Sequence, residues 1–80
     1  MFKYIIVRNQ EQKEVAILFS KTLVHKQVAS LHSSMFGPWV VSAGFVTLSP
    51  EGYVAVGESE TLRLKSRPED TQIIRDLFQE

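Results

Sequence analysis

Hydrophobic and polar positions alternate most clearly between Pro38 and Ser59, in the segment PWVVSAGFVTLSPEGYVAVGES. β-Branched and aromatic residues dominate on both sides of the sequence Ser49-Pro50-Glu51-Gly52, and such residues fit a pleated, half-buried surface. Proline presets φ at the first position of a turn, and glycine adopts the left-handed conformation that closes a three-residue loop. The pattern therefore predicts a β-hairpin with Pro50, Glu51 and Gly52 as its loop.

A three-residue loop determines which residues of this hairpin face each other. The expected pairs are Ser49 with Tyr53, Leu48 with Val54, Thr47 with Ala55, Val46 with Val56, and Phe45 with Gly57. Because side chains alternate between the two faces, one face carries four aliphatic residues, which we assign to the core: Val46, Leu48, Val54 and Val56. The opposite face carries Ala43, Phe45, Thr47, Tyr53, Ala55 and Gly57.

The N-terminal part of the chain predicts another hairpin. Residues Phe2 to Arg8 alternate in the manner of a strand, and the polar segment Asn9 to Lys13 is typical of a turn. Val15 to Phe19 form a short continuous apolar run, which predicts a second and more central strand.

A helix is predicted between the two hairpins, with Ser20 as its N-cap and its end near Met35. Gly37-Pro38 is expected to stop this helix. Its apolar stripe comprises Val24, Val28, Leu31 and Met35, whereas Lys21, His25, Lys26 and Gln27 are expected to face water.

A second helix is predicted near the C-terminus. Ser66 is the expected N-cap, Pro68 suits the first turn, and Glu69 would reach back to complete a capping box. The apolar stripe of this helix comprises Ile73, Ile74, Leu77 and Phe78. Before it, the segment Leu62-Arg63-Leu64 is compatible with either a short strand or an extended arm.

These elements predict one α+β domain over residues 1–80, with an antiparallel sheet built from two hairpins and a helix after each, in the order ββαββα. The 80 residues include no cysteine, which excludes disulfides, thiolate zinc sites and thiol nucleophiles. No apolar run approaches the ~20 residues needed to cross a bilayer, and no signal peptide is evident. We therefore expect a soluble protein of a reducing cytoplasm.

Charge is balanced overall but divided along the chain. Residues 1–40 carry five Lys or Arg against two Glu, a net charge of +3, and residues 41–80 carry four against seven acidic residues, a net charge of −3. The chain thus lacks the strongly basic balance of most non-specific nucleic-acid binders.

No combination of side chains predicts a catalytic, cofactor or metal site. His25 and His32 lie seven positions apart on one helix, about 10 Å along its axis, which is too far for shared metal ligation. The carboxylates that invite a paired-acid interpretation are explained as solvated loop charges and helix-start acids: Glu58, Glu60, Glu69 and Asp70. We therefore expect a protein that is not an enzyme.

Two segments are candidate binding sites. Arg63, Lys65, Ser66 and Arg67 place three cations before a helix N-terminus, a geometry that suits phosphate, although a capped helix with exposed basic residues is the favoured interpretation. Trp39, Val41, Phe45 and Tyr53 lie on the second face of the central hairpin. That face is a protein interface if both helices cover the opposite face, and core if one helix crosses over.

Four segments resemble a group of small uncharacterised proteins encoded by bacteriophages and prophages of proteobacteria. They are VVSAGFV (Val40 to Val46), GESETL (Gly57 to Leu62), KSRPEDTQII (Lys65 to Ile74) and FSKTLVHKQVA (Phe19 to Ala29), about half of the chain. The resemblance implies a bacterial host cell and an accessory phage role, and it assigns no site residue.

Two functional hypotheses follow. The first is a non-enzymatic protein that binds a host or phage protein, or its own second copy, through Phe45 and Tyr53; inhibition of a host enzyme or defence complex is one such role. The alternative is a nucleic-acid-binding protein that uses Arg63, Lys65 and Arg67.

Overall fold

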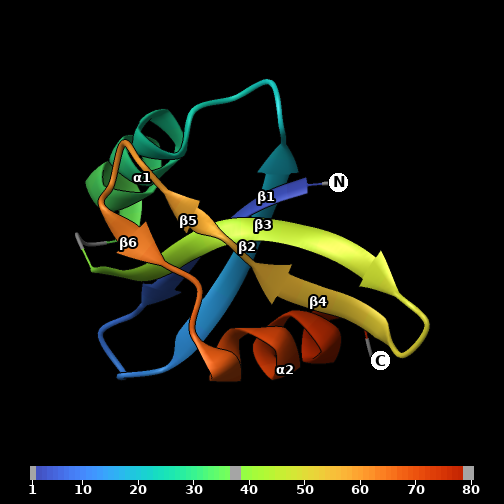
Figure 1. The fold of residues 1–80 in the computed structure, drawn as a ribbon. Helices are drawn as coiled ribbons and strands as arrows, with labels where there is room; N and C mark the ends of the chain where they lie inside the picture. Colours follow the sequence, from blue (N-terminus) through green and yellow to red (C-terminus); the bar gives the residue numbers. More distant parts are fainter. Residues whose placement is uncertain (1, 37–38, 79–80) are drawn as a thin grey trace.

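Four antiparallel strands form a sheet in which the first strand of the chain lies inside, in the order β2-β1-β3-β4 (Figure 1). The strands are β1 (Phe2–Arg8), β2 (Glu14–Ser20), β3 (Val40–Ser49) and β4 (Gly52–Val56). The structure, a computed structural model, describes residues 2–36 and 39–78, and the side chains of 31–36 lie outside that description. The predicted strand at 15–19 is thus an edge strand and not a central one, because β3 returns to pair with β1.

Two helices and a small second sheet complete the α+β fold. The helices are α1 (His25–Phe36) and α2 (Pro68–Leu77), and the two-stranded sheet pairs β5 (Glu58–Ser59) with β6 (Leu64–Lys65). The antiparallel sheet and the two helices are confirmed, but the observed order is ββαββββα. The extra strands arise because the segment around Leu62 to Leu64 folds back onto β5 through a turn in which Arg63 has a φ of 56°.

Each helix packs on a different face of the main sheet. Ile74 of α2 lies in a buried cluster with Tyr4 and Ile6, whereas Val28 of α1 lies in a second cluster with Ile5. Because successive residues of a strand point to opposite faces, α1 and α2 cover opposite sides of β1. Figure 1 shows α2 running below the sheet and α1 at the opposite end of the molecule.

The register of the central hairpin differs by one residue from the prediction. Its loop has two residues, Pro50 and Glu51, and Gly52 itself pairs with Ser49. Gly52 keeps the expected positive φ, at 118°, but the Ser49 hydroxyl closes the loop more tightly by accepting the Glu51 N–H (3.3 Å) and donating to the Gly52 carbonyl (2.9 Å).

The shorter loop exchanges the two faces of β4. Tyr53 lies opposite Leu48 and Ala55 opposite Val46, so Tyr53 and Ala55 pack towards α2. The predicted core set is therefore wrong in part. Of its members, Val46 is buried, Leu48 is 72% exposed, and Val54 and Val56 belong to the α1 face. A one-residue slip produces this exchange because the side-chain period of a strand is two.

Helix α1 begins four residues later than predicted because Ser20 still belongs to β2. The Gln27 side chain accepts the Val24 N–H (3.3 Å), which supports the first turn without Ser20. His25, the first residue of the helix, is only 4% exposed, whereas Val24, just before it, is 38% exposed, the reverse of the prediction for these two residues; Val28 is buried as predicted. The expected stripe residues Leu31 and Met35 and the expected stop at Gly37-Pro38 lie outside the described residues and side chains.

Helix α2 begins with Pro68 in its first turn, as predicted, but its N-cap is Arg67 and not Ser66. The Asp70 carboxylate accepts the Arg67 N–H (3.0 Å), the role predicted for Glu69. Asp70 takes this role because it faces the sheet, whereas Glu69 faces water.

The observed register predicts which engineered cysteines can form a disulfide. Leu48→Cys combined with Tyr53→Cys should oxidise to a disulfide, since the two residues face each other across the strands on one face. The chain has no other cysteine to compete. The matched control, Leu48→Cys with Val54→Cys, should stay reduced under the same conditions. Free-thiol titration after mild oxidation measures both. A disulfide that forms only in the control would contradict the observed register and support the three-residue loop.

Candidate functional site

A row of exposed apolar side chains crosses the α2 face of the sheet, next to the C-terminal end of α2. It consists of Phe2 on β1, Leu48 on β3, Tyr53 on β4 and Phe78 directly after α2. Phe2 is 47% exposed, Leu48 72% and Phe78 52%, and Tyr53 is half-buried between them. We call these four residues the apolar row.

The backbone register and α2 position the apolar row. Phe2 pairs with Val46, two residues before Leu48 on the same face, and Leu48 pairs with Tyr53. The ring of Phe78 stacks on that of Tyr53, with centroids 4.7 Å apart and planes inclined by 24°. These contacts hold large side chains in place before any partner binds, which lowers the entropy cost of docking.

The four residues predicted to form a protein interface do not share one face. Tyr53 belongs to the apolar row on the α2 side, whereas Phe45 lies on the α1 side, with its ring 5.6 Å from that of His25. Val41 packs towards the α2 cluster, and Trp39 is exposed immediately before β3.

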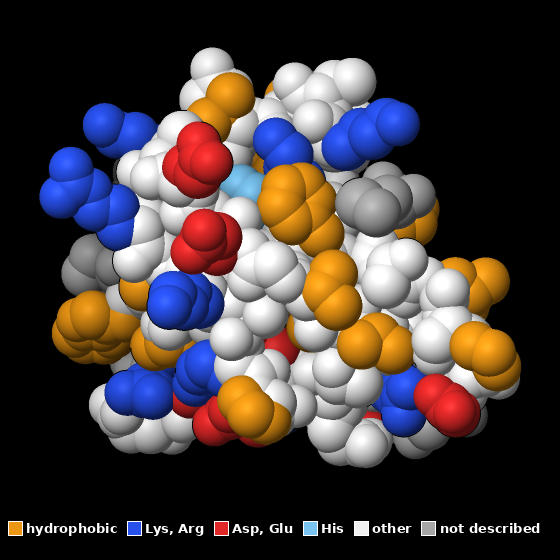
Figure 2. Space-filling model, viewed as in Figure 1, with side chains coloured by type: hydrophobic (Ala, Val, Ile, Leu, Met, Phe, Trp, Pro, Cys, Tyr) orange, Lys and Arg blue, Asp and Glu red, His pale blue; other side chains and the backbone are white. Residues whose placement is uncertain are grey.

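A bulge explains the position of Val41. On β3, Ser42 pairs with Ile6 and Val40 pairs with Val7, so Val41 is left over and points to the opposite face from that expected. The predicted single aromatic face is therefore wrong. Figure 2 nevertheless shows hydrophobic side chains gathered over β3 and β4 on the visible face, beside a histidine.

The predicted anion site retains only part of its positive charge. Arg67 forms ion pairs with Glu14 (2.7 Å) and Asp70 (2.8 Å), and Lys65 lies opposite Glu58 in the small sheet. Arg63 is exposed in the turn before β6. Ser66 is half-buried and its N–H donates to the Gly57 carbonyl (2.9 Å).

The N-terminus of α2 already has an anion. The carboxylate of Asp70 accepts the N–H of Arg67, so an external phosphate would have to compete with a buried group of the protein. The anion-binding position expected at this helix end is therefore occupied by the protein's own carboxylate.

A network of charged groups joins α2 to the first hairpin. The Asp70 carboxylate has no exposed surface and accepts hydrogen bonds from the Tyr4 hydroxyl (2.6 Å) and from Nε of Arg67 (2.9 Å). The Arg67 guanidinium also donates a hydrogen bond to the Glu14 carboxylate (2.7 Å), which accepts a further hydrogen bond from Arg8 (2.8 Å).

Electrostatics in the network follow from burial and pairing. Burial, together with the bond to Asp70, raises the pKa of Tyr4 far above its usual value, so its hydroxyl stays protonated and donates. Hydrogen bonds from Arg67 and then Arg8 lower the pKa of Glu14 to about 2. Because Tyr4 and Asp70 have no exposed surface, no substrate can reach them, and the network is structural.

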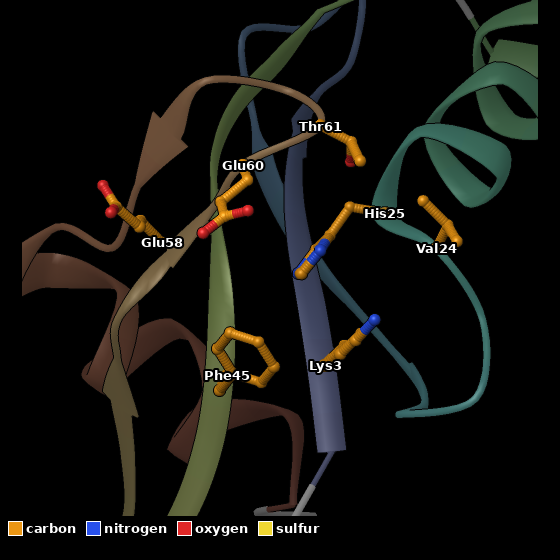
Figure 3. A pocket seen from close by; sticks show the side chains of 7 residues that line it. All are labelled: Lys3, Val24, His25, Phe45, Glu58, Glu60 and Thr61. Atoms are coloured by element: carbon orange, nitrogen blue, oxygen red, sulfur yellow. The ribbon is translucent and has the colours of Figure 1, made fainter.

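A cavity of about 450 Å³ lies between α1 and the small sheet (Figure 3). It is lined by Lys3, Val24, His25, Phe45, Glu58, Glu60 and Thr61. The inner groups are already paired, since His25 Nε2 donates to the Gly44 carbonyl (2.8 Å) and the Lys3 ammonium donates to that of Leu23 (2.7 Å). The burial of His25 was missed because helical spacing placed it on the polar side.

The carboxylates considered for paired-acid chemistry are divided between different parts of the fold. Glu58 and Glu60 flank the cavity, whereas Asp70 is buried beneath the sheet and Glu69 is exposed on α2. Across the described residues, His, Asp and Glu form no group of three or more that could hold a metal ion. Nor does any described helix have the length and apolar character needed to span a membrane.

Comparison with protein families, curated proteins and solved structures found no match to this chain.

The buried hydrogen bond between Tyr4 and Asp70 predicts a stability loss in Tyr4→Phe. The substitution leaves the buried carboxylate without one donor, which costs about 1–3 kcal/mol of the free energy of unfolding. Tyr53→Phe is the matched control, because the Tyr53 hydroxyl bonds to no residue in the described part of the chain, and it should change stability by less than about 0.5 kcal/mol. Urea unfolding of the three proteins measures this, and equal losses would contradict the structural role of the bond.

The lowered pKa of Glu14 predicts a pH-dependent contribution to stability. A carboxyl whose folded pKa lies below its ordinary value of 4.5 stabilises the fold fully above about pH 5, and this contribution disappears as the pH falls towards 2. Because Glu14 is partly exposed and water screens its ion pairs, the contribution should be on the order of 1 kcal/mol or less. The stability difference between the wild type and Glu14→Gln should therefore shrink between pH 6 and pH 2; a constant difference would show that the ion pairs contribute nothing.

Proposed function

We propose that this chain is a small, non-enzymatic, phage-type accessory protein of the bacterial cytoplasm that binds another protein through the apolar row. The observation that carries the proposal is the exposure of three large side chains, Phe2, Leu48 and Phe78, around the half-buried Tyr53. A contiguous apolar patch on a small domain marks an interface more often than an isolated exposed residue does.

The chemistry of the row defines the class of partner. Phe78 and Tyr53 present stacked aromatic rings, and Leu48 presents a protruding aliphatic side chain. These groups match a partner surface that has apolar side chains at its centre. Arg75 borders the row from α2, where its Nε donates to the Tyr53 carbonyl (2.8 Å). The phage and bacterial setting rests on the resemblance of the segments at 19–29, 40–46, 57–62 and 65–74. Inhibition of a host enzyme or defence complex is compatible with this mode of action.

The test is a comparison of one variant in the row with a matched variant outside it. Leu48→Glu places a charge at the most exposed apolar position and should leave the fold intact, since the side chain is 72% exposed. Leu23→Glu is the same change at an exposed leucine in the loop before α1. Proteins captured from a bacterial lysate by the wild type and by Leu23→Glu, but not by Leu48→Glu, are the expected partners.

Affinity for the purified partner then decides the proposal. Leu48→Glu should raise Kd at least about tenfold, equivalent to about 1.4 kcal/mol, and Leu23→Glu should leave it unchanged. Equal affinity of the wild type and Leu48→Glu for every captured protein would refute the apolar row as the docking site.

A further inference from the structure

The two edge strands of the main sheet, β4 and β2, differ in whether their outward backbone groups are hydrogen-bonded by the rest of the described chain. On β4, the Ala55 N–H donates to the Thr71 hydroxyl (3.0 Å), and the Tyr53 carbonyl accepts from Arg75 Nε (2.8 Å). Both partners are side chains of α2, so this edge is occupied. The other edge is the outer side of β2, where no further strand pairs within the described part of the chain.

Two hydrogen bonds show which backbone groups of β2 point outwards. At the end of β1, the Arg8 N–H donates to the Trp39 carbonyl on the β3 side (2.8 Å), and the next residue, Asn9, donates to the Lys13 carbonyl on the β2 side (2.9 Å). Since backbone directions alternate along a strand, odd-numbered residues of β1 bond to β2, and the paired residues there are Val15, Ile17 and Phe19.

Ala16 and Leu18 therefore present their N–H and C=O groups outwards. Over residues 2–36 and 39–78, no backbone or side-chain group hydrogen-bonds to them. Unpaired backbone groups of this kind are a template for another strand.

The edge lacks three features that often prevent pairing, namely lysine, proline and a bulge, although the residue Ala16 is itself only 6% exposed. Between Glu14 and Ser20 all five residues are apolar, with no lysine and no proline, and β2 pairs with β1 over seven consecutive residues without a bulge. An apolar edge strand of this length without a bulge favours association with a further strand.

We propose that β2 pairs antiparallel with β2 of a second copy of this chain, centred on Ile17, so that two four-stranded sheets become continuous. Read in either direction, β2 has a polar residue, five apolar residues and a polar residue, and this symmetry is what an isologous contact requires.

The centred register satisfies both the backbone and the side chains. Ala16 of one copy lies opposite Leu18 of the other, so their outward groups exchange hydrogen bonds. Ile17 lies opposite Ile17 and Val15 opposite Phe19, which are apolar pairs on the α1 face. Only the end pairs, Glu14 with Ser20, contain polar residues.

The experiment measures molar mass by sedimentation or light scattering from about 1 μM to about 1 mM, the range of weak to moderate association. The wild type should approach twice the monomer mass at the upper end. Ile17→Lys should halve that mass, because two lysines would face each other across the dyad. Val54→Lys, at a half-buried valine on the occupied edge strand, is the matched control and should remain dimeric.

Hydrogen exchange of the wild type gives an answer that needs no variant. The amides of Ala16 and Leu18 should exchange at least about tenfold more slowly at the upper concentration than at the lower, whereas that of Ala55 should not change. A monomer at every concentration, or a dimer whose Ala16 and Leu18 amides remain unprotected, would overturn the proposal and leave this edge to a strand of another protein or to water. Leu48→Glu should still dimerise, which separates this test from that of the apolar row.

Discussion

The position of α2 depends on the burial of one carboxylate. Asp70 has no exposed surface, and a buried carboxylate without partners would cost several kcal/mol. Its donors come from Tyr4 on β1 and from Arg67 at the start of α2 itself. Helix α2 is therefore stable on the sheet only where these groups meet, which fixes the start of the helix against β1 and β2.

The placement of α2 determines which surfaces remain available. From its fixed start the helix crosses the sheet to β4, where Thr71 and Arg75 bond to outward backbone groups, and Phe78 reaches the ring of Tyr53. One edge is occupied as a result, and the apolar row forms at the end of the helix. Antiparallel pairing of two β2 strands would keep the α2 faces of both copies on the same side, so a dimer would present two apolar rows together.

Much of the secondary structure could be predicted because it depends on local patterns. The alternation in residues 2–8, the apolar run at 15–19 and the turn around Pro50 all correspond to observed strands and a loop. Pro68 likewise lies in the first turn of α2, because a missing N–H is tolerated there. The register of the central hairpin was missed because the Ser49 hydroxyl favours a two-residue loop. Neither the composition nor the spacing of residues distinguishes a two-residue loop from a three-residue loop at this position.

The sequence by itself determined the α+β class, the two hairpins and the existence of both helices. Only the tertiary structure decided which faces and edges are open, because these depend on contacts between residues far apart in the chain. The bulge at Val41, the inward rotation of His25 and the partnership of Tyr4 with Asp70, 66 positions away, are of this kind. Tyr53 illustrates the difference: its strand was predictable from β-propensity, but its place in the apolar row followed from a one-residue change of register and from the path of α2.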